Sequence, residues 1–270
     1  MRLGLIAGNR LLPLILSQKI KESNKNCQIV AVCFKGETRP SISKYVDKTY
    51  WIKVGQLARL RQIMKEEKVV EWIMAGQINP MRIFKRRVWD DELVSLVDKL
   101  EDFRPHNIFF EIINYLENQG IKFLDSTLYL QDCLSGEGVM NNLLLSGEQE
   151  KDIEFGIKVA SRYVDLDVGQ TIVVKKQSVV ALESLEGTNA TILRGGRLAG
   201  RGATVFKFSK TNQDLRFDVP VVGIGTLKLL KGIGAAACVL EKEKVIILEK
   251  QKFLSLARKW DILIIGRDKS

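Results

Sequence analysis

Two lysines, an arginine and two aspartates lie within one twelve-residue stretch of the carboxyl-terminal half. They are Lys207, Lys210, Asp214, Arg216 and Asp218. Lysine and arginine bind phosphate oxygens, whereas carboxylates bind hard divalent cations. The alternation of charged and apolar residues predicts a strand with Asp214, Arg216 and Asp218 on one face. An edge strand with a merely charged outer face has the same pattern and remains the alternative.

A second candidate for phosphate binding is a glycine-bearing loop ahead of a helix predicted at residues 190–194. Gly187, Thr188 and Asn189 offer backbone N–H groups, a hydroxyl and an amide, which can hold phosphate without a Walker motif. Arg194 follows about two helical turns later and adds a cation. The alternative is an ordinary surface helix capped by Thr188 or Asn189.

Oxygen ligands are the expected ligands of any metal ion in this chain. The sequence has one histidine, His106, and four widely separated cysteines, which do not make a zinc site or a disulfide framework. A carboxylate site suits Mg²⁺, with Mn²⁺ as an alternative. The predicted metal ligands are Asp218, Asp214, Glu183 and Glu186.

The chain opens with a Rossmann-like pattern: a strand at 2–7, a tight turn, and a helix at 11–21. Gly8 and Asn9 follow this strand, and Gly76 and Gln77 follow a later one. Functional loops lie at the carboxyl ends of parallel strands, so these four residues are candidates for substrate binding. The glycines do not form G-x-G-x-x-G, which gives a dinucleotide cofactor little support.

The element pattern changes near residue 133 and predicts an α/β protein with a distinct α+β second domain. Residues 1–133 alternate strands and helices, which predicts a parallel sheet covered on both faces. Residues 134–148 are expected to be a linker, within a second domain at 134–270 that opens with a helix and a hairpin at 171–182. Further strands are predicted at 204–208, 216–217, 221–224, 238–240, 245–248 and 262–265.

The net charge of +10 favours anionic partners. Residues 1–133 and 134–270 each hold 21 basic and 16 acidic residues, so the excess is spread and no nucleic-acid-binding arm is expected. The sequence starts without a signal peptide pattern, and no apolar run approaches the ~18 residues of a membrane span. We therefore expect a cytoplasmic protein in peripheral contact with anionic membrane lipid.

Several motifs in order resemble one family. They are Leu5–Gly8, Ala75-Gly76, Asp167–Gln170, Glu183–Arg194 and Gln213–Gly223. Over essentially its whole length the chain resembles the UDP-2,3-diacylglucosamine pyrophosphatases of the LpxI type. The resemblance implies Mg²⁺-dependent hydrolysis of UDP-2,3-diacylglucosamine to UMP and 2,3-diacylglucosamine 1-phosphate (lipid X) in lipid A synthesis. It implies a Rossmann-like domain, a second domain, and a lipid held between them.

The resemblance places the family's essential aspartate on Asp218. It places the family's E-G-T-D-A motif on residues 186–190, where Asn189 replaces the aspartate and removes a charge. We expect Lys207, Lys210, Arg194 and Arg216 to neutralise the pyrophosphate. The location implied is the inner face of the inner membrane, and a homodimer is left open. A non-catalytic nucleotide- or lipid-binding protein of the same fold is the alternative, supported by Asn189.

Overall fold

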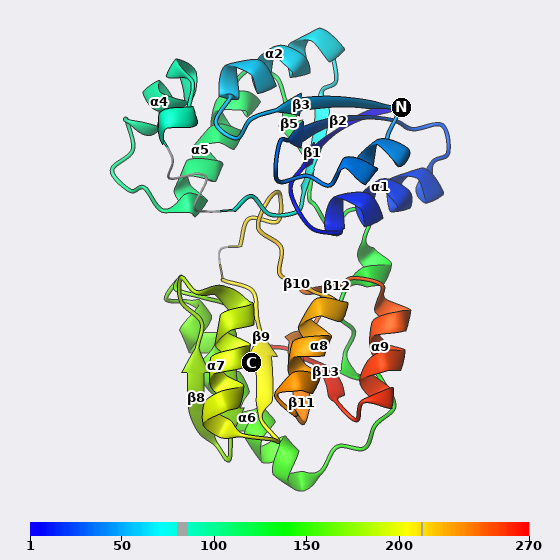
Figure 1. Ribbon diagram of the computed structural model, residues 1–270, viewed down its shortest axis with the longest axis vertical. Helices are drawn as coiled ribbons and strands as arrows, with labels where there is room; N and C mark the ends of the chain where they lie inside the picture. The colour runs from blue at the N-terminus through cyan, green and yellow to red at the C-terminus, as the bar shows by residue number, and fades with distance from the viewer. Residues whose placement is uncertain (80–85, 212, 270) are drawn as a thin grey trace. The chain divides into compact units, whose positions relative to one another are not determined.

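The computed structural model describes residues 1–79, 86–211 and 213–269. Its contacts divide the chain into two compact units, shown in Figure 1. The first unit consists of Met1–Leu130 together with Leu215–Phe217. The second consists of Gln131–Asp214 and Asp218–Ser270. The short segment 215–217 therefore belongs to the first unit although its flanking residues belong to the second.

A parallel five-stranded sheet forms the centre of the first unit, as far as its described residues show. The strand order is β3-β2-β1-β4-β5. The strands are β1 (Arg2–Ala7), β2 (Gln28–Phe34), β3 (Lys48–Ile52), β4 (Glu71–Ala75) and β5 (Lys122–Phe123). The order reverses between β1 and β4, which is the switch point of a Rossmann-like sheet. The predicted Rossmann-like domain is confirmed.

The helices of the first unit cover its sheet because alternate strand residues point to opposite faces. Ile6, Val32 and Trp72 lie in one apolar core with residues of α2, α4 and α5. Gly4 allows this packing, since a Cβ there would lie 2.0 Å from the Trp72 ring. The helices are α1 (Leu12–Ser23), α2 (Leu57–Glu67), α4 (Asp91–Val97) and α5 (Pro105–Glu117).

A six-stranded mixed sheet forms the centre of the second unit, in the order β6-β13-β11-β9-β7-β8. Its strands are β6 (Gly138–Val139), β7 (Thr171–Lys175), β8 (Ser178–Leu182), β9 (Thr204–Lys207), β11 (Ala237–Glu241) and β13 (Leu263–Arg267). Strands β9, β11 and β13 are parallel, whereas the predicted β7–β8 hairpin is antiparallel. A separate parallel pair joins β10 (Val221–Val222) to β12 (Ile246–Ile247). The distinct α+β domain is thus confirmed.

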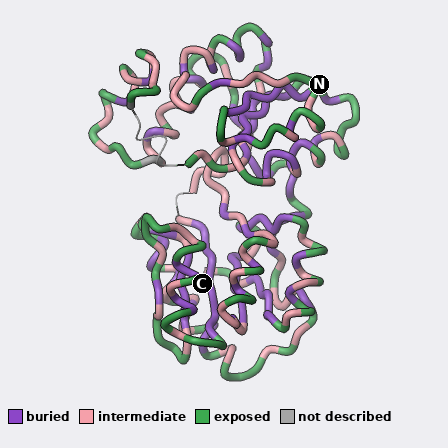
Figure 2. Tube along the Cα trace, in the orientation of Figure 1, coloured by how far each residue is buried: buried purple, intermediate pink, exposed green. Residues whose placement is uncertain are grey.

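Helices pack on both faces of the second sheet, again following the alternation of its strands. Ile172 and Phe206 share a core with helix α6, whereas Val173 and Val205 share one with α7, α8 and α9. These helices are α6 (Gly147–Val164), α7 (Gly187–Ala199), α8 (Ile224–Gly232) and α9 (Lys250–Lys259). Figure 2 shows the buried strands enclosed by helices whose outer surfaces are exposed.

The expected linker at residues 134–148 is wrong in part. Gly138 and Val139 form β6, which pairs antiparallel with β13 at one edge of the second sheet. Asn141 is buried, donates to the carbonyl of Ile262 at 2.8 Å and accepts from the amide of Ile264 at 3.2 Å. A two-residue strand has no periodicity to detect, and its place is fixed by this side-chain contact with distant backbone.

No helix in the described parts of the chain is both long and apolar enough to cross a membrane.

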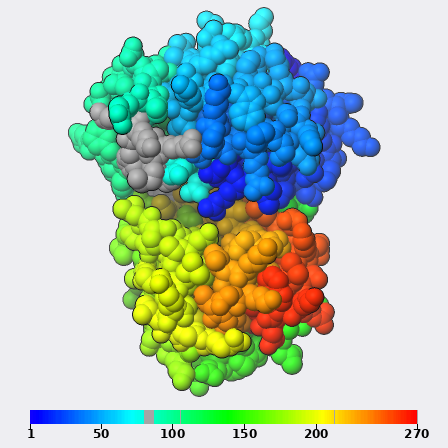
Figure 3. All heavy atoms as spheres, viewed as in Figure 1, coloured from blue at the N-terminus to red at the C-terminus, as the bar shows by residue number. Residues whose placement is uncertain are grey.

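On the visible face of the second unit, Figure 3 shows the surface of α7 beside that of α8 and α9.

Candidate functional site

Three loops meet at one end of the second sheet. They follow helix α6, strand β8 and strand β9. The backbone amide of Phe208 donates to the carbonyl of Gln170 at 3.0 Å, and that of Glu183 donates to the carbonyl of Thr171 at 2.9 Å. The loops are thus joined through the backbone, and their side chains form the candidate site.

Thr188 is the centre of a hydrogen-bond network at the start of α7. Its hydroxyl donates to the carboxylate of Glu183, 3.0 Å away, and accepts from the hydroxyl of Thr171 at 3.2 Å. It also accepts from the ammonium of Lys207 at 2.9 Å. The helix has no side-chain cap, so the alternative of a capping Thr188 or Asn189 is wrong. Asn189 is exposed in the first turn.

Lys207 places a buried positive charge beside this helix start. The residue is 7% exposed, and its ammonium forms no ion pair among the residues that the structure describes. A buried charge is costly without a partner of opposite sign, and a helix N-terminus also attracts anions. The carboxylate of Glu183 contacts the same Thr188 hydroxyl, so Lys207 and Glu183 are joined through Thr188 at the start of α7.

The other predicted cations of the second unit are already paired with carboxylates. Arg194 contacts Glu186 at 2.6 Å and donates to the carbonyl of Leu182 at 2.7 Å. The hydrogen bond from Arg194 to Glu186 lowers the pKa of the Glu186 carboxyl. Lys210 contacts Asp167 at 2.5 Å. Arg194 and Lys210 thus contact a carboxylate directly, whereas Lys207 is joined to the Glu183 carboxylate through the Thr188 hydroxyl.

The predicted strand through residues 216–217 is wrong. The chain turns there, and the amide of Asp218 donates to the carbonyl of Asp214 at 2.9 Å. Asp214, Arg216 and Asp218 therefore do not line one face of a strand. Gln213 holds this turn near the site, since its side chain donates to the carbonyl of Asp218 and accepts from Gln170.

Arg216 lies in the first unit with its neighbours. It contacts Glu117 at 2.8 Å and lies over the ring of Phe110, 5.8 Å from the ring centroid. The backbone amide of Ser126 donates to the carbonyl of Leu215, and its hydroxyl donates to the carbonyl of Arg216. Phe217 packs on His106, with 5.1 Å between the ring centroids. These contacts explain why the segment departs from the strand that its alternation predicted.

The predicted metal ligands do not form a ready-made cage. Among the described residues, no three histidine, cysteine, aspartate or glutamate side chains gather in a way that could hold a metal ion. Glu183 and Glu186 are engaged by Thr188 and Arg194. Mg²⁺ commonly takes one or two carboxylates and completes its shell with water and substrate phosphates. The turn from Asp214 to Asp218 carries two carboxylates, which is the number that such a Mg²⁺ site uses.

The predicted substrate-binding loops of the first unit do lie together. The amide of Gly8 donates to Ala75 at 2.7 Å, and that of Asn9 donates to Gln77 at 2.8 Å. Gly76 has φ +86°, and a Cβ there would lie 2.5 Å from the Asn9 carbonyl oxygen. Glycine is therefore required where the loops after β1 and β4 approach each other at the switch point of the sheet.

Residues that the sequence analysis gave no role complete the second-unit site. Gln170 and Thr171 bridge the loops, and only the resemblance had marked this segment. Tyr163 lies beneath them: a Cβ on Gly169 would be 2.5 Å from its hydroxyl oxygen. That hydroxyl is buried with no hydrogen-bond partner among the described residues. Burial, together with the nearby Glu183 and Glu186, raises the pKa of Tyr163 to about 12.

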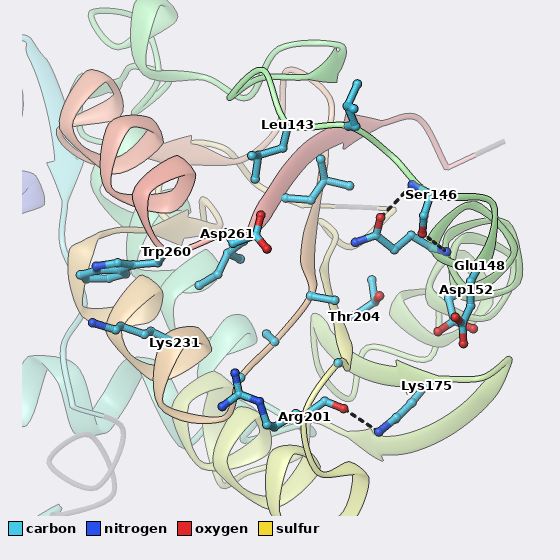
Figure 4. Close-up of a pocket in the computed structure, with 18 of the residues that line it drawn as sticks. Leu143, Ser146, Glu148, Asp152, Lys175, Arg201, Thr204, Lys231, Trp260 and Asp261 are labelled. Carbon is cyan, nitrogen blue, oxygen red and sulfur yellow. Dashed lines mark hydrogen bonds between the residues drawn. The ribbon is translucent and has the colours of Figure 1, made fainter.

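A groove of about 1070 Å³ lies at the opposite end of the second sheet (Figure 4). It is bordered by Thr204 and Leu263, which begin two of the parallel strands. Lys175 closes one side by donating to the carbonyl of Arg201 at 2.6 Å. Ligands of open α/β sheets bind at the carboxyl ends of parallel strands. The loops around Lys207, at the carboxyl end of β9, are therefore the better candidate.

The fold defines a two-domain α/β protein with a Rossmann-like first domain and a distinct mixed second domain. The chain belongs to the LpxI family: the LpxI N-terminal domain matches residues 2–133, and the LpxI C-terminal domain matches residues 136–265.

One similar protein is the UDP-2,3-diacylglucosamine pyrophosphatase LpxI of Caulobacter vibrioides. It is 24% identical over 292 aligned positions, which cover 99% of this chain and 98% of that protein. Solved structures of the biotin carboxylase domain of 2-oxoglutarate carboxylase, one from Hydrogenobacter thermophilus, have TM-scores of 0.28 at 12% and 13% identity. They match 63% and 65% of this chain but only 34% and 35% of their own chains, and they carry no argument.

Proposed function

We propose that the protein hydrolyses the pyrophosphate bond of UDP-2,3-diacylglucosamine, giving UMP and 2,3-diacylglucosamine 1-phosphate in lipid A synthesis. Family membership across both domains and the name of the Caulobacter relative support this substrate. The observation within the molecule that carries the proposal is the buried Lys207 ammonium at the start of α7. A phosphate group supplies a direct ion pair, which Lys207 does not make with the described residues.

In this proposal the second-unit loops bind the pyrophosphate. Lys207 donates to its oxygens, and the N-terminus of α7 adds its positive field. Phosphoryl transfer depends mainly on positioning and on stabilising developing charge, which such fixed donors provide. Arg194 and Lys210 extend the positive field but are held by Glu186 and Asp167.

Asp218 is the proposed catalytic residue, and it would hold Mg²⁺ together with Asp214. When bound, the ion supplies charge neutralisation at the phosphate oxygens. Gln213 fixes the turn that presents both aspartates. Asp218 also serves to orient the attacking water, because a carboxylate accepts its hydrogen bond.

A non-catalytic nucleotide- or lipid-binding protein is the second candidate. Asn189 favours it, because it stands where the family motif has an aspartate. Asn189 is exposed and lies beyond the Thr188 network, so the network itself survives the change. Turnover of the purified protein on UDP-2,3-diacylglucosamine separates the two candidates.

Asp218→Asn tests the catalytic role while preserving the shape of the side chain. We expect turnover to fall by roughly 100-fold or more, about 2.7 kcal/mol, with substrate affinity and the thermal midpoint nearly unchanged. Release of UMP is followed with and without Mg²⁺, and metal-stripped protein in excess EDTA should be inactive.

The matched control is Asp268→Asn, since Asp268 is an exposed aspartate near the end of the same unit. It should retain full turnover. Near-normal activity of the Asp218 variant, or full activity in EDTA, contradicts the proposed roles.

A further inference from the structure

Glu241 is a buried carboxylate next to the loop that carries Lys207 and Lys210. It is the last residue of β11, which pairs with β9 so that Leu240 lies opposite Lys207. The residue is 7% exposed, and its Oε2 accepts from the backbone amide of Ser209 at 2.5 Å and from the hydroxyl of Ser209 at 2.6 Å. Ser209 is itself buried, so Glu241 fixes an interior point of the loop after β9.

The position of this carboxylate is determined by the backbone around it. The hydroxyl of Ser135 donates to the carbonyl of Glu241, and the amide of Ser135 donates to the carbonyl of Val245 at 2.9 Å. The second carboxylate oxygen, Oε1, lies 3.7 Å from the ammonium of Lys269, which is longer than a hydrogen bond. Burying a carboxylate is costly unless it is hydrogen-bonded, and Ser209 provides both of the hydrogen bonds described above.

Ser209 lies in the middle of a run of backbone amides that are held by different parts of the second unit. The preceding amide donates to the carbonyl of Gln170 at 3.0 Å, and the following one donates to the side chain of Gln213 at 2.6 Å. The amide between them donates to Glu241. The loop is thus fixed residue by residue directly after Lys207.

These contacts connect the buried carboxylate to the groups that the proposed function uses. Ser209 lies between Lys207 and Lys210, and Gln213 donates onward to the carbonyl of Asp218. A displacement of Ser209 would therefore move the two lysines directly and Asp218 through Gln213. The carboxylate itself is unsuited to binding the substrate's pyrophosphate, because its negative charge repels phosphate oxygens.

We infer that Glu241 is a positioning residue for the loop after β9, and that it acts through Ser209. The inference rests on the proposed function, because it takes the pyrophosphate to be bound at this loop. It extends that function by giving a role to a carboxylate that contacts neither the phosphate nor the ion. A small displacement of a positioned group can lower a rate by about 100-fold, so a residue that fixes the loop can control turnover without touching the substrate.

Glu241→Ala, Glu241→Gln and Ser209→Ala test this inference in the intact chain. Glu241→Ala should lower kcat/KM for UDP-2,3-diacylglucosamine roughly tenfold or more. Glu241→Gln should recover most of that loss, because an amide oxygen has two lone pairs for the two donors of Ser209. Ser209→Ala removes one of the two hydrogen bonds and should cause a smaller loss. Combined with Glu241→Ala it should add nothing, since both changes break the same contact.

Asp152→Ala is the matched control for stability. Asp152 is also a buried carboxylate that accepts from two backbone amides, those of Lys176 at 3.0 Å and Gln177 at 2.6 Å. It borders the groove at the opposite end of the sheet (Figure 4). We expect Asp152→Ala to lower the thermal midpoint while turnover, measured well below that midpoint, stays at the wild-type value. In hydrogen exchange, the amides of residues 207–211 should be less protected in Glu241→Ala but unchanged in Asp152→Ala.

Wild-type kcat/KM in folded Glu241→Ala overturns the inference, and so does an equal loss of activity in Asp152→Ala. If Glu241→Ala does not fold, Ser209→Ala decides the question, because wild-type turnover by that variant also overturns the inference.

Calorimetric titration with inorganic pyrophosphate separates this inference from the proposed function. A protein that hydrolyses no UDP-2,3-diacylglucosamine, but binds pyrophosphate less tightly after Glu241→Ala, keeps the inference and refutes the proposed reaction. A protein that hydrolyses its substrate equally well with and without the Glu241 carboxylate keeps the reaction and refutes the inference. A wild-type protein that neither binds pyrophosphate nor turns over refutes both.

Discussion

We expect the charge of Lys207 to serve binding more than stability. Its ammonium is buried beside the hydroxyl of Thr188, whereas the carboxylates of Glu186 and Asp167 pair with Arg194 and Lys210. A buried charge left without an opposite charge normally lowers the stability of the fold. Its presence at a helix N-terminus is explained if an anion completes the pair.

Lys207→Met separates these two contributions. Removing the charge while retaining the length of the side chain should leave the thermal midpoint unchanged or higher, because no ion pair among the described residues is broken. Affinity for the pyrophosphate substrate should fall roughly tenfold or more, as expected for a charged hydrogen bond. The measurements are the Michaelis constant and a thermal melt.

Lys244→Met removes an equal charge from an exposed position in the same unit and should change neither quantity. If Lys207→Met lowers the midpoint and leaves substrate affinity intact, Lys207 is structural and the phosphate site must lie elsewhere.

The sequence indicated which side chains of the second unit carry charges or hydroxyl groups, but it did not indicate which residues they contact. The charges of Lys207 and Lys210 and the hydroxyl of Thr188 were evident from residue type. Their partners were not, because Thr171 and Asp167 lie 17 and 43 positions away from Thr188 and Lys210 and meet them only through the fold.

Among the elements, long periodic segments were predictable and short or glycine-bearing ones were not. The predicted strand at 2–7 and the hairpin at 171–182 are confirmed, because their apolar runs are long enough to show a pattern. Helix α7 begins at Gly187, earlier than the predicted residue 190. Glycine disfavours helix in isolation, so the sequence pattern did not indicate this first turn. The contact between Thr188 and Glu183 fixes the turn. The false strand at 216–217 arose because Phe217 packs in the first unit.

Glycines on the inner faces of helices set the distance between helix and sheet. In α6, a Cβ on Gly156 would lie 2.0 Å from the Phe206 ring, far inside van der Waals contact. Gly195 plays the same part in α7 against Val173, where the distance would be 2.6 Å. These contacts hold β9, which ends at the candidate site, and β7, which begins there.

Gly156→Ala should have two opposing effects of different size on the stability of the fold. Alanine favours helix by about 1 kcal/mol over glycine, but forcing a methyl group into a closed contact costs typically 1–3 kcal/mol or more. With only 2.0 Å between the added Cβ and the Phe206 ring, the second effect should dominate, and the free energy of unfolding should fall by about 2 kcal/mol. Denaturant unfolding monitored by circular dichroism measures it.

Gly147→Ala, in the same helix, adds its methyl group where nothing lies within 4 Å and should not destabilise. Phe206→Leu should relieve part of the penalty when combined with Gly156→Ala. Equal stability of the two alanine variants would show that α6 shifts freely on the sheet.

The net charge is a property of the whole chain, and its distribution bears on where the protein works. The excess of ten positive charges is divided equally between residues 1–133 and 134–270. A spread charge gives long-range attraction to an anionic surface without a defined anchor. The described residues contain no helix that is long and apolar enough to cross a membrane.

We therefore expect weak, reversible binding to vesicles that contain phosphatidylglycerol. Binding should decline steadily as salt is added, because the Debye length falls from about 10 Å at 0.1 M to about 3 Å at 1 M ionic strength. Flotation of the intact protein with vesicles across a salt series measures this, and vesicles of phosphatidylcholine alone are the control. If the attraction is electrostatic, neutral vesicles bind little at any salt concentration. Binding that persists in high salt, or that is equal on neutral lipid, would instead require apolar insertion and would reject the role assigned to the +10 charge.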